Sequence, residues 1–174
     1  KEFIAASMTM DISNQNKLSE FYEELKRLNI NIIRPNINKC FADFKADDNN
    51  FYYALGGIKA VGYEAISNII NERTENGKFK SINDFLNRVK PKDINKLQLE
   101  GLVKGGAFDN LHNNRQALLI SIPNFIIKNK NIYENKSTNQ IDLFGEEQLN
   151  KDEIITSVED LKFEERLSKE FEAI

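Results

Sequence analysis

A lysine and a glycine stand in the short run Ile58-Lys59-Ala60-Val61-Gly62, directly before a segment with helical periodicity. That segment, Tyr63 to Arg73, repeats apolar residues at the spacing of one buried helix face. The first N–H groups of such a helix have no partners within the helix, and the helix dipole favours an anion beside them. Because a glycine in the turn lets the main chain approach that anion closely, the run predicts a phosphate-binding turn.

This pattern is typical of a helix-hairpin-helix, whose turn grips the phosphate backbone of DNA. Such contacts do not read the bases, so binding should be largely independent of base sequence and weakened by salt. The candidate contact residues are the turn itself and basic side chains in or after the following helix: Gly57, Lys59, Ala60, Val61, Gly62, Arg73, Lys78, Lys80, Lys96 and Lys104. The alternative is a glycine turn that only joins two core helices, with the later lysines as solvated surface charges.

The composition narrows the class of protein. Among 174 residues there is one cysteine, Cys40, which excludes an internal disulfide and fits a reducing cytoplasm, where we expect the protein. A lone histidine beside a lone cysteine argues against a zinc site, and no apolar run is long enough to predict a membrane helix or a membrane partner. The chain begins with Lys1 rather than Met, so we expect it to be part of a larger protein.

The net charge of −3 is unevenly distributed along the chain. Residues 51–110 carry nine basic and seven acidic side chains, whereas residues 111–174 carry eight and twelve. This is a weak electrostatic footprint for a DNA-binding protein, and we expect modest DNA affinity from this chain alone.

Hydrophobic spacing predicts a mainly α-helical chain with a few short strands. Helices are expected over residues 18–28, 63–76, 82–89 and 93–104 and from about 114, with short strands near 32–33 and 51–55. The pattern of helix, glycine turn and helix occurs around Gly62 and again around Gly105-Gly106, which predicts a tandem helix-hairpin-helix core. Pro123 should kink or end the last of these helices.

We divide the chain into three parts. Residues 1–55 combine a helix with short strands, and residues 56–128 form the tandem helix-hairpin-helix domain. Residues 129–174 begin with a polar linker up to residue 139 and continue with an acidic, loosely packed stretch at 146–160. A final helix is expected to start near Ser157 or Asp160 and to carry Leu161, Leu167 and Phe171.

Seven blocks of this chain resemble, in order, the alpha (catalytic) subunit of bacterial DNA polymerase III, the C-family replicative polymerase. Each block alone is weak, but together they cover nearly the whole chain. The blocks are Phe3 to Thr9, Arg34 to Asn38, Tyr53 to Gly62, Phe79 to Phe85, Ile94 to Lys96, Gly106 to Asp109 followed by Asn114-Arg115, and Gln140 to Gly145.

The resemblance implies that residues 1–55 are the distal fingers, followed by the tandem helix-hairpin-helix region and the lead-in to an oligonucleotide-binding domain. The palm aspartates and a phosphoesterase-like domain would precede Lys1, so this chain alone should be inactive and hold no cofactor. The parent protein would extend primers with deoxynucleoside triphosphates and two Mg²⁺ ions. Its partners would be double-stranded or primer-template DNA, the sliding clamp and other replisome subunits.

Three departures from the family pattern affect the site. Ala60 stands where the family usually has the first glycine of Gly-Val-Gly, and its β-carbon opposes both positive φ and close phosphate contact. Leu97-Gln98 stands where basic residues are common. Pro123 interrupts a helix that is usually continuous in the family. Apart from these departures, Asp43, Asp47 and Asp48 are the nearest acidic cluster, but they lie among turn residues and are poor candidates for catalytic magnesium.

The pentapeptide Gln140-Ile141-Asp142-Leu143-Phe144 is similar to the motif with which bacterial polymerases bind the sliding clamp. Leu143 and Phe144 would fill an apolar pocket of the clamp, and Gln140 would bond at the edge of that pocket. In the alternative, the apolar residues only attach the linker to the preceding helices.

Two other classes of function remain open from the sequence. The chain could be a helix-hairpin-helix module of a repair or recombination protein, which palm-type aspartates upstream would exclude. It could also be a pure interaction module, in which the hairpins are structural and the clamp motif alone binds a partner.

Overall fold

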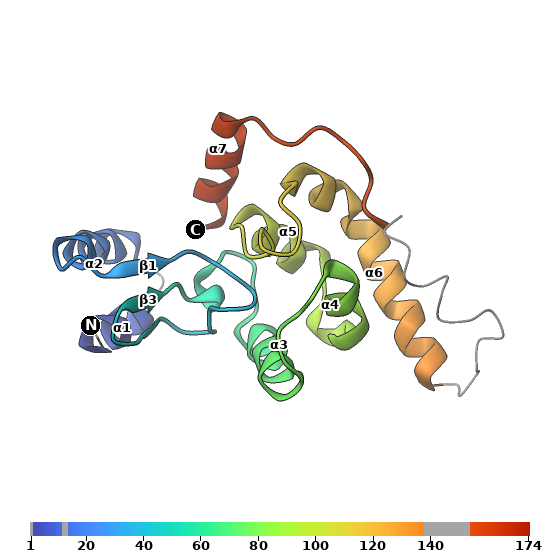
Figure 1. Cartoon of the computed structure of the whole chain (residues 1–174), viewed down its shortest axis with the longest axis horizontal. Coiled ribbons are helices and arrows are strands. Elements are labelled where there is room, and N and C mark those ends of the chain that lie inside the picture. The colour runs from blue at the N-terminus through green and yellow to red at the C-terminus, as the bar shows by residue number, and fades with distance from the viewer. Residues whose placement is uncertain (1, 12–13, 138–153) are drawn as a thin grey trace.

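The computed structural model describes residues 2–11, 14–137 and 154–174. The described chain is mainly helical with one small sheet, as predicted (Figure 1). The N-terminal unit contains α1 (Glu2–Met10), α2 (Gln15–Arg27), β1 (Asn31–Ile33), β2 (Lys45–Ala46) and β3 (Asn50–Tyr52). The helical unit contains the 3-10 turn η1 (Leu55–Gly57), α3 (Tyr63–Asn76), α4 (Ile82–Arg88), the 3-10 turn η2 (Pro91–Asp93), α5 (Lys96–Lys104), α6 (Arg115–Ser137) and α7 (Phe163–Ala173).

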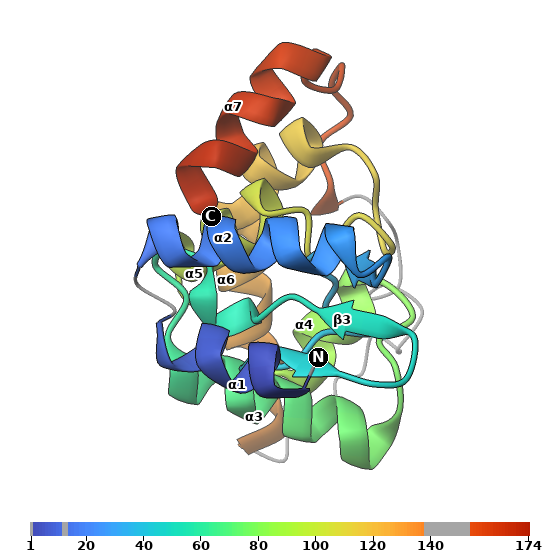
Figure 2. The ribbon, with the colours of Figure 1, turned by 90° about the vertical axis from the view of Figure 1, so that its left-hand side faces the viewer.

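The sheet has strand order β1-β3-β2, with β1 parallel and β2 antiparallel to β3. Its side chains alternate between two cores, as the period of a strand requires. Ile32 and Phe51 pack with α1 and α2, whereas Ile33 and Tyr52 pack against the larger helical core. Figure 2 shows α1 and α2 in front of the rest of the molecule. The sheet therefore joins the two units.

Local signals set several element ends, although α2 begins at Gln15 rather than at the expected residue 18. Asn14 caps α2, because its side chain accepts a hydrogen bond from the Lys17 amide at 3.3 Å. Asn29 follows that helix with a φ of 53°, and Gly77 ends α3 with a φ of 82°. Ser81 caps α4 by accepting from the Asp84 amide at 3.1 Å.

The second hairpin does not lie at Gly105-Gly106 as predicted. These glycines end α5, but residues 107–114 then form a long irregular connection to α6. The short connection is the one from α4 to α5, at residues 89–95, which contains η2. Asn95 caps α5 by accepting from the Gln98 amide at 2.8 Å, so this helix begins later than the predicted residue 93. A glycine pair indicates an unusual backbone conformation, and at Gly105-Gly106 that conformation ends α5 rather than forming a hairpin.

Helix α6 corrects two further predictions, because it continues through Pro123 and on to Ser137. A proline inside a helix costs about 3 kcal/mol. Pro123 is exposed, whereas Ile122 and Phe125 are buried on the opposite face, each worth about 1.5–3 kcal/mol. Beyond them, the buried Asn129 donates to the carbonyls of Leu86 and Val89 at 2.7 and 2.8 Å. Packing against α4 therefore keeps residues 129–137 helical where a linker was expected.

The acidic stretch expected to be loosely packed is held against α6 in its described part, residues 154–160. The Thr156 amide donates to Ser121 Oγ at 2.9 Å, and Asn114 Nδ2 donates to the Val158 carbonyl at 2.7 Å. These bonds lead the chain back toward α5, where the final helix begins at Phe163, after the predicted start.

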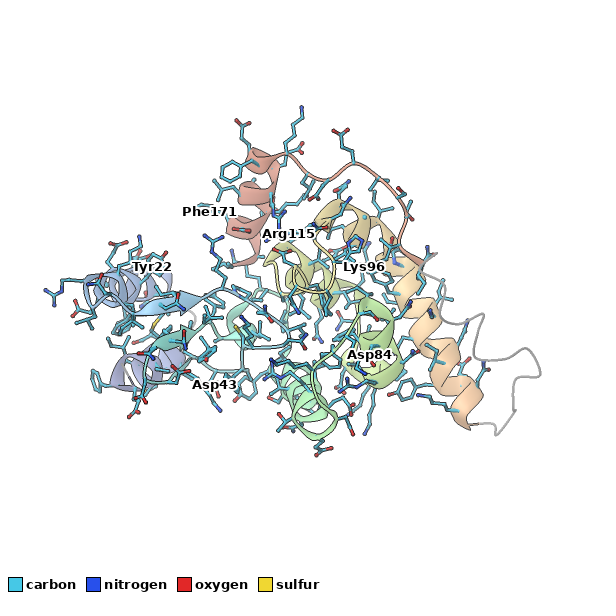
Figure 3. All side chains as sticks on the ribbon, viewed as in Figure 1. Tyr22, Asp43, Asp84, Lys96, Arg115 and Phe171 are labelled. Atoms are coloured by element: carbon cyan, nitrogen blue, oxygen red, sulfur yellow. The ribbon has the colours of Figure 1, made fainter. Side chains whose placement is uncertain are left out.

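Helix α7 faces the core with two charged side chains, Arg166 and Glu170, whereas its large apolar side chains point outward. Arg115, itself buried, makes ion pairs of 2.7 Å with Asp109 and with Glu170 of α7 (Figure 3). The apolar side chains Phe163 and Phe171 are 79% and 78% exposed. Ion pairs therefore hold this helix to the core, together with the buried Ala173 at its C-terminal end.

Candidate nucleic-acid interface

The first hairpin is a tight turn held by two buried apolar side chains. Ile58 and Val61 are buried, and the Val61 amide donates to the Ile58 carbonyl at 3.1 Å, which closes the turn. Ala60 occupies the third position with a φ of 64°, where a type II turn requires positive φ. The β-carbon of Ala60 was expected to oppose this conformation, but Ala60 adopts it. The hairpin shape is therefore kept at a conformational cost.

Helix α5 contacts this hairpin backbone to backbone. A β-carbon built on Gly101 would lie 2.6 Å from the Lys59 carbonyl oxygen and 3.4 Å from Ile58 and Val61 side-chain carbons. Only glycine fits such an approach. The lack of a side chain at Gly101 thus allows the close approach of the hairpin backbone to α5.

The buried side chain of Gln98 connects the two hairpins by hydrogen bonds, a role that the sequence did not predict. Its Oε1 accepts from the Gly62 amide at 3.2 Å, and its Nε2 donates to the Asp93 carbonyl at 2.6 Å. Asn68 Nδ2 of α3 also donates to Asp93 Oδ1 at 2.9 Å. The N-termini of α3 and α5 consequently lie beside one another, each after a short turn.

This juxtaposition creates a place for anions. Gly62 is the N-cap of α3 and supplies no side chain to its first-turn amides, whereas α5 is capped by Asn95. The free amide hydrogens and the positive ends of both helix dipoles favour negative charge there. A phosphate at this position would be bound by main chain first and by side chains second.

Four exposed lysines surround the two helix N-termini: Lys59, Lys90, Lys92 and Lys96. Lys92 lies 4.0 Å from Glu64, which is 88% exposed, and Lys96 lies 3.8 Å from Glu100. Exposed pairs of this kind are worth about 0–1 kcal/mol, so a phosphate can replace them. The candidate set from the sequence lacked Lys90 and Lys92, although they flank Pro91 in a turn and could have been found by that signal.

Arg73 was predicted to contact DNA, and the structure places it elsewhere. It is buried near the far end of α3, where its Nη1 donates to the carbonyls of Ile37 and Cys40, each at 2.7 Å. Burial lowers the pKa of this guanidinium. Arg73 therefore holds the loop between β1 and β2 to α3 and is not available to a phosphate.

The remaining predicted lysines lie apart from the paired N-termini. Lys78 and Lys80 are exposed beyond the C-terminus of α3, about 20 Å along the helix from the hairpin. Lys104 ends α5, and its Nζ lies 3.4 Å from Glu172 of α7. Of the predicted lysines, Lys59 and Lys96 lie in the turn or first turn that begins α3 and α5, and Lys104 lies near the C-terminal end of α7 that the Lys59 amide also contacts.

Helix α7 also reaches the first hairpin. The Lys59 amide donates to the Ala173 carbonyl at 2.8 Å, and Ala173 is buried. One main-chain donor of the turn is thus already used, which leaves the first turns of α3 and α5 as the anion donors.

The acidic residues near the sheet do not fit a catalytic metal site. Asp43 Oδ2 accepts from the Tyr63 hydroxyl at 2.7 Å. The Asp47 carboxylate accepts from the Tyr52 hydroxyl at 2.6 Å and from the Asn49 and Asn50 amides, bonds that lower its pKa. Among the described residues, no group of three or more His, Cys, Asp or Glu side chains is placed to hold a metal ion.

Two further features concern partners. The pentapeptide Gln140–Phe144 lies outside the described residues, so its role stays a prediction. In the part of the chain that the structure describes, no helix is both long and apolar enough to cross a membrane.

Residues 29–118 match the family model described as "Helix-hairpin-helix motif". The match contains the paired hairpins and the lysines around them, and it covers half of the chain. The chain therefore belongs to the helix-hairpin-helix family.

Several proteins named DNA polymerase III subunit alpha are similar to this chain. The protein from Caulobacter vibrioides is 37% identical over 144 residues, covering 83% of this chain and 13% of the relative. The proteins from Borreliella burgdorferi and Campylobacter jejuni are 41% and 38% identical, over 82% and 85% of this chain. The chain thus spans about an eighth of the length of these relatives.

Proposed function

We propose that this chain is the duplex-binding part of a replicative DNA polymerase and that it grips DNA by the phosphate backbone. The observation that carries this proposal is the pairing of the α3 and α5 N-termini through Gln98, with exposed lysines on both turns. Two anion positions side by side suit a polymer of regularly spaced phosphates better than a single small anion. The names of the relatives support a polymerase over a repair module.

In this proposal the longer protein extends a primer from deoxynucleoside triphosphates with Mg²⁺, using residues outside this chain. The present residues hold the new duplex and add affinity without base recognition. Binding should therefore be insensitive to base sequence and steeply dependent on salt.

The test is fluorescence anisotropy of the chain with a labelled duplex across a salt series. Lys59→Glu and Lys92→Glu should each weaken binding and reduce the salt slope by about 1. Lys130→Glu is the matched control, because Lys130 is an exposed lysine in the C-terminal half of α6. If all three variants have the same duplex affinity, or if the unsubstituted chain shows no salt-sensitive binding, the hairpins are structural.

We further propose that Gln140 to Phe144 attach the polymerase to its sliding clamp. This rests on the sequence motif, which begins three residues after α6 ends at Ser137. Replacing Leu143 and Phe144 by alanine should abolish clamp binding in calorimetry and leave duplex binding unchanged. A control replacement of Gln148 and Asn150 should leave both unchanged. Clamp binding that survives the first replacement would exclude this role.

A further inference from the structure

A second basic site lies beside the sheet, with Lys78, which follows α3, at one edge. It is a hollow of about 490 Å³ between the sheet and the loop that connects β1 to β2. Three lysines line it, Lys39, Lys45 and Lys78, together with the aromatic rings of Phe41 and Tyr52. We call this the lysine pocket.

The lysine pocket is assembled by specific bonds rather than by chance proximity. Asn38 Nδ2 donates to the Phe79 carbonyl at 2.8 Å, and Asn38 Oδ1 accepts from the Phe79 amide at 2.9 Å. This reciprocal pair brings Lys39 next to Lys78. Arg73 then fixes the same loop through its bonds to the Ile37 and Cys40 carbonyls. The buried arginine thus supports this pocket.

The charge of the pocket is largely uncompensated. Among the described residues, none of the three lysine ammonium groups makes an ion pair with a carboxylate. Lys45 instead lies 4.2 Å above the Phe41 ring. One carboxylate, Asp47, also lines the hollow, so the three lysines and this aspartate leave a net charge of +2. Because three cations line one hollow, we expect its ligand to carry several negative charges.

We infer that the lysine pocket binds the backbone of single-stranded nucleic acid. The open hollow can hold a chain that passes through it, with its phosphates on the lysines. A duplex is an unsuitable occupant, because its phosphates lie on a wide cylinder whereas these lysines converge on one hollow. The inference goes beyond the duplex-binding role and does not depend on it, since it uses different residues.

The test compares a labelled oligo-dT with a labelled duplex, both titrated by anisotropy at low salt. The double variant Lys39→Ala with Lys78→Ala should lose at least about 10-fold in oligo-dT affinity, because two phosphate contacts are removed. Its duplex affinity should change less than about 2-fold. Lys80→Ala is the matched control: it is an exposed lysine two residues from Lys78 that does not line the pocket.

Each outcome decides the inference. Selective loss of oligo-dT binding supports it, and the hairpin variant Lys59→Glu should show the opposite selectivity. Equal loss for both ligands, or the same loss with Lys80→Ala, would mean general charge attraction and overturn it. Binding of dTTP but not of oligo-dT would assign the pocket to free nucleotides and overturn it as well. All substituted side chains are exposed, so circular dichroism should show an unchanged fold.

Discussion

Replacing Ala60 by glycine should stabilise the protein, whereas replacing an alanine by glycine inside a helix destabilises it. The φ of 64° at Ala60 costs an L-residue about 1–2 kcal/mol. Glycine removes this cost but gives the unfolded chain more freedom, which offsets about 0.4–1 kcal/mol. Ala60 is exposed, so its methyl group contributes little packing. The net expectation is a gain of about 0.5–1 kcal/mol in the free energy of unfolding.

The assay is urea unfolding followed by circular dichroism, with the slope against urea unchanged. The matched control is Ala6→Gly, at an exposed position inside α1, which should cost about 1 kcal/mol. The two substitutions are chemically identical and should shift the midpoint in opposite directions. If Ala60→Gly is as destabilising as Ala6→Gly, the hairpin does not hold Ala60 in the left-handed region, and our account of its shape is wrong.

Four other outcomes follow from contacts described above. Gly101→Ala should destabilise by about 1–3 kcal/mol in urea and weaken duplex binding, because its β-carbon would displace the Lys59 carbonyl. Asn129→Ala should cost about 1–3 kcal/mol, since two buried carbonyls at the end of α4 lose their donor; an unchanged midpoint would contradict this. Arg73→Met should lower stability and oligo-dT binding but leave duplex affinity intact, the reverse of what a DNA-contacting arginine would show. Burial raises the pKa of the Cys40 thiol from 9.0 to about 11, so its contribution to stability is complete below pH 9 and is lost as pH rises toward 11. That loss is on the order of 3 kcal/mol, and Cys40→Ser should flatten the fall in urea midpoint across this range.

Features with a local cause were predictable from the sequence. The cap at Asn14, the left-handed ends at Asn29 and Gly77 and the cap at Ser81 each depend on one residue and its immediate neighbours. The first hairpin belongs to the same group, because its turn and the following apolar periodicity are adjacent in the chain. Short-range signals of this kind do not depend on tertiary contacts, so they can be identified in the sequence.

Features with a distant cause were not predictable. Leu97 follows the apolar spacing but is 63% exposed, whereas Gln98 is buried because it bridges two turns that meet only in the fold. Pro123 stays helical because of packing on the opposite face of α6. Arg73 is buried by carbonyls more than 30 residues away in the chain. In each case the tertiary contact outweighs the local preference.

Helix α3 also acts as a spacer of fixed length. Its 14 residues run about 20 Å from the first hairpin to Gly77, and Lys78 of the lysine pocket follows directly. Its first residue, Tyr63, bonds to Asp43, and Arg73 near its other end bonds to the Cys40 carbonyl of the same loop, so both ends of the helix are held. Adjacent nucleotides in a duplex are 3.4 Å apart along the axis, so this span equals about six nucleotides. One DNA molecule that contacts both the first hairpin and Lys78 would therefore cover about that many nucleotides between the two contacts.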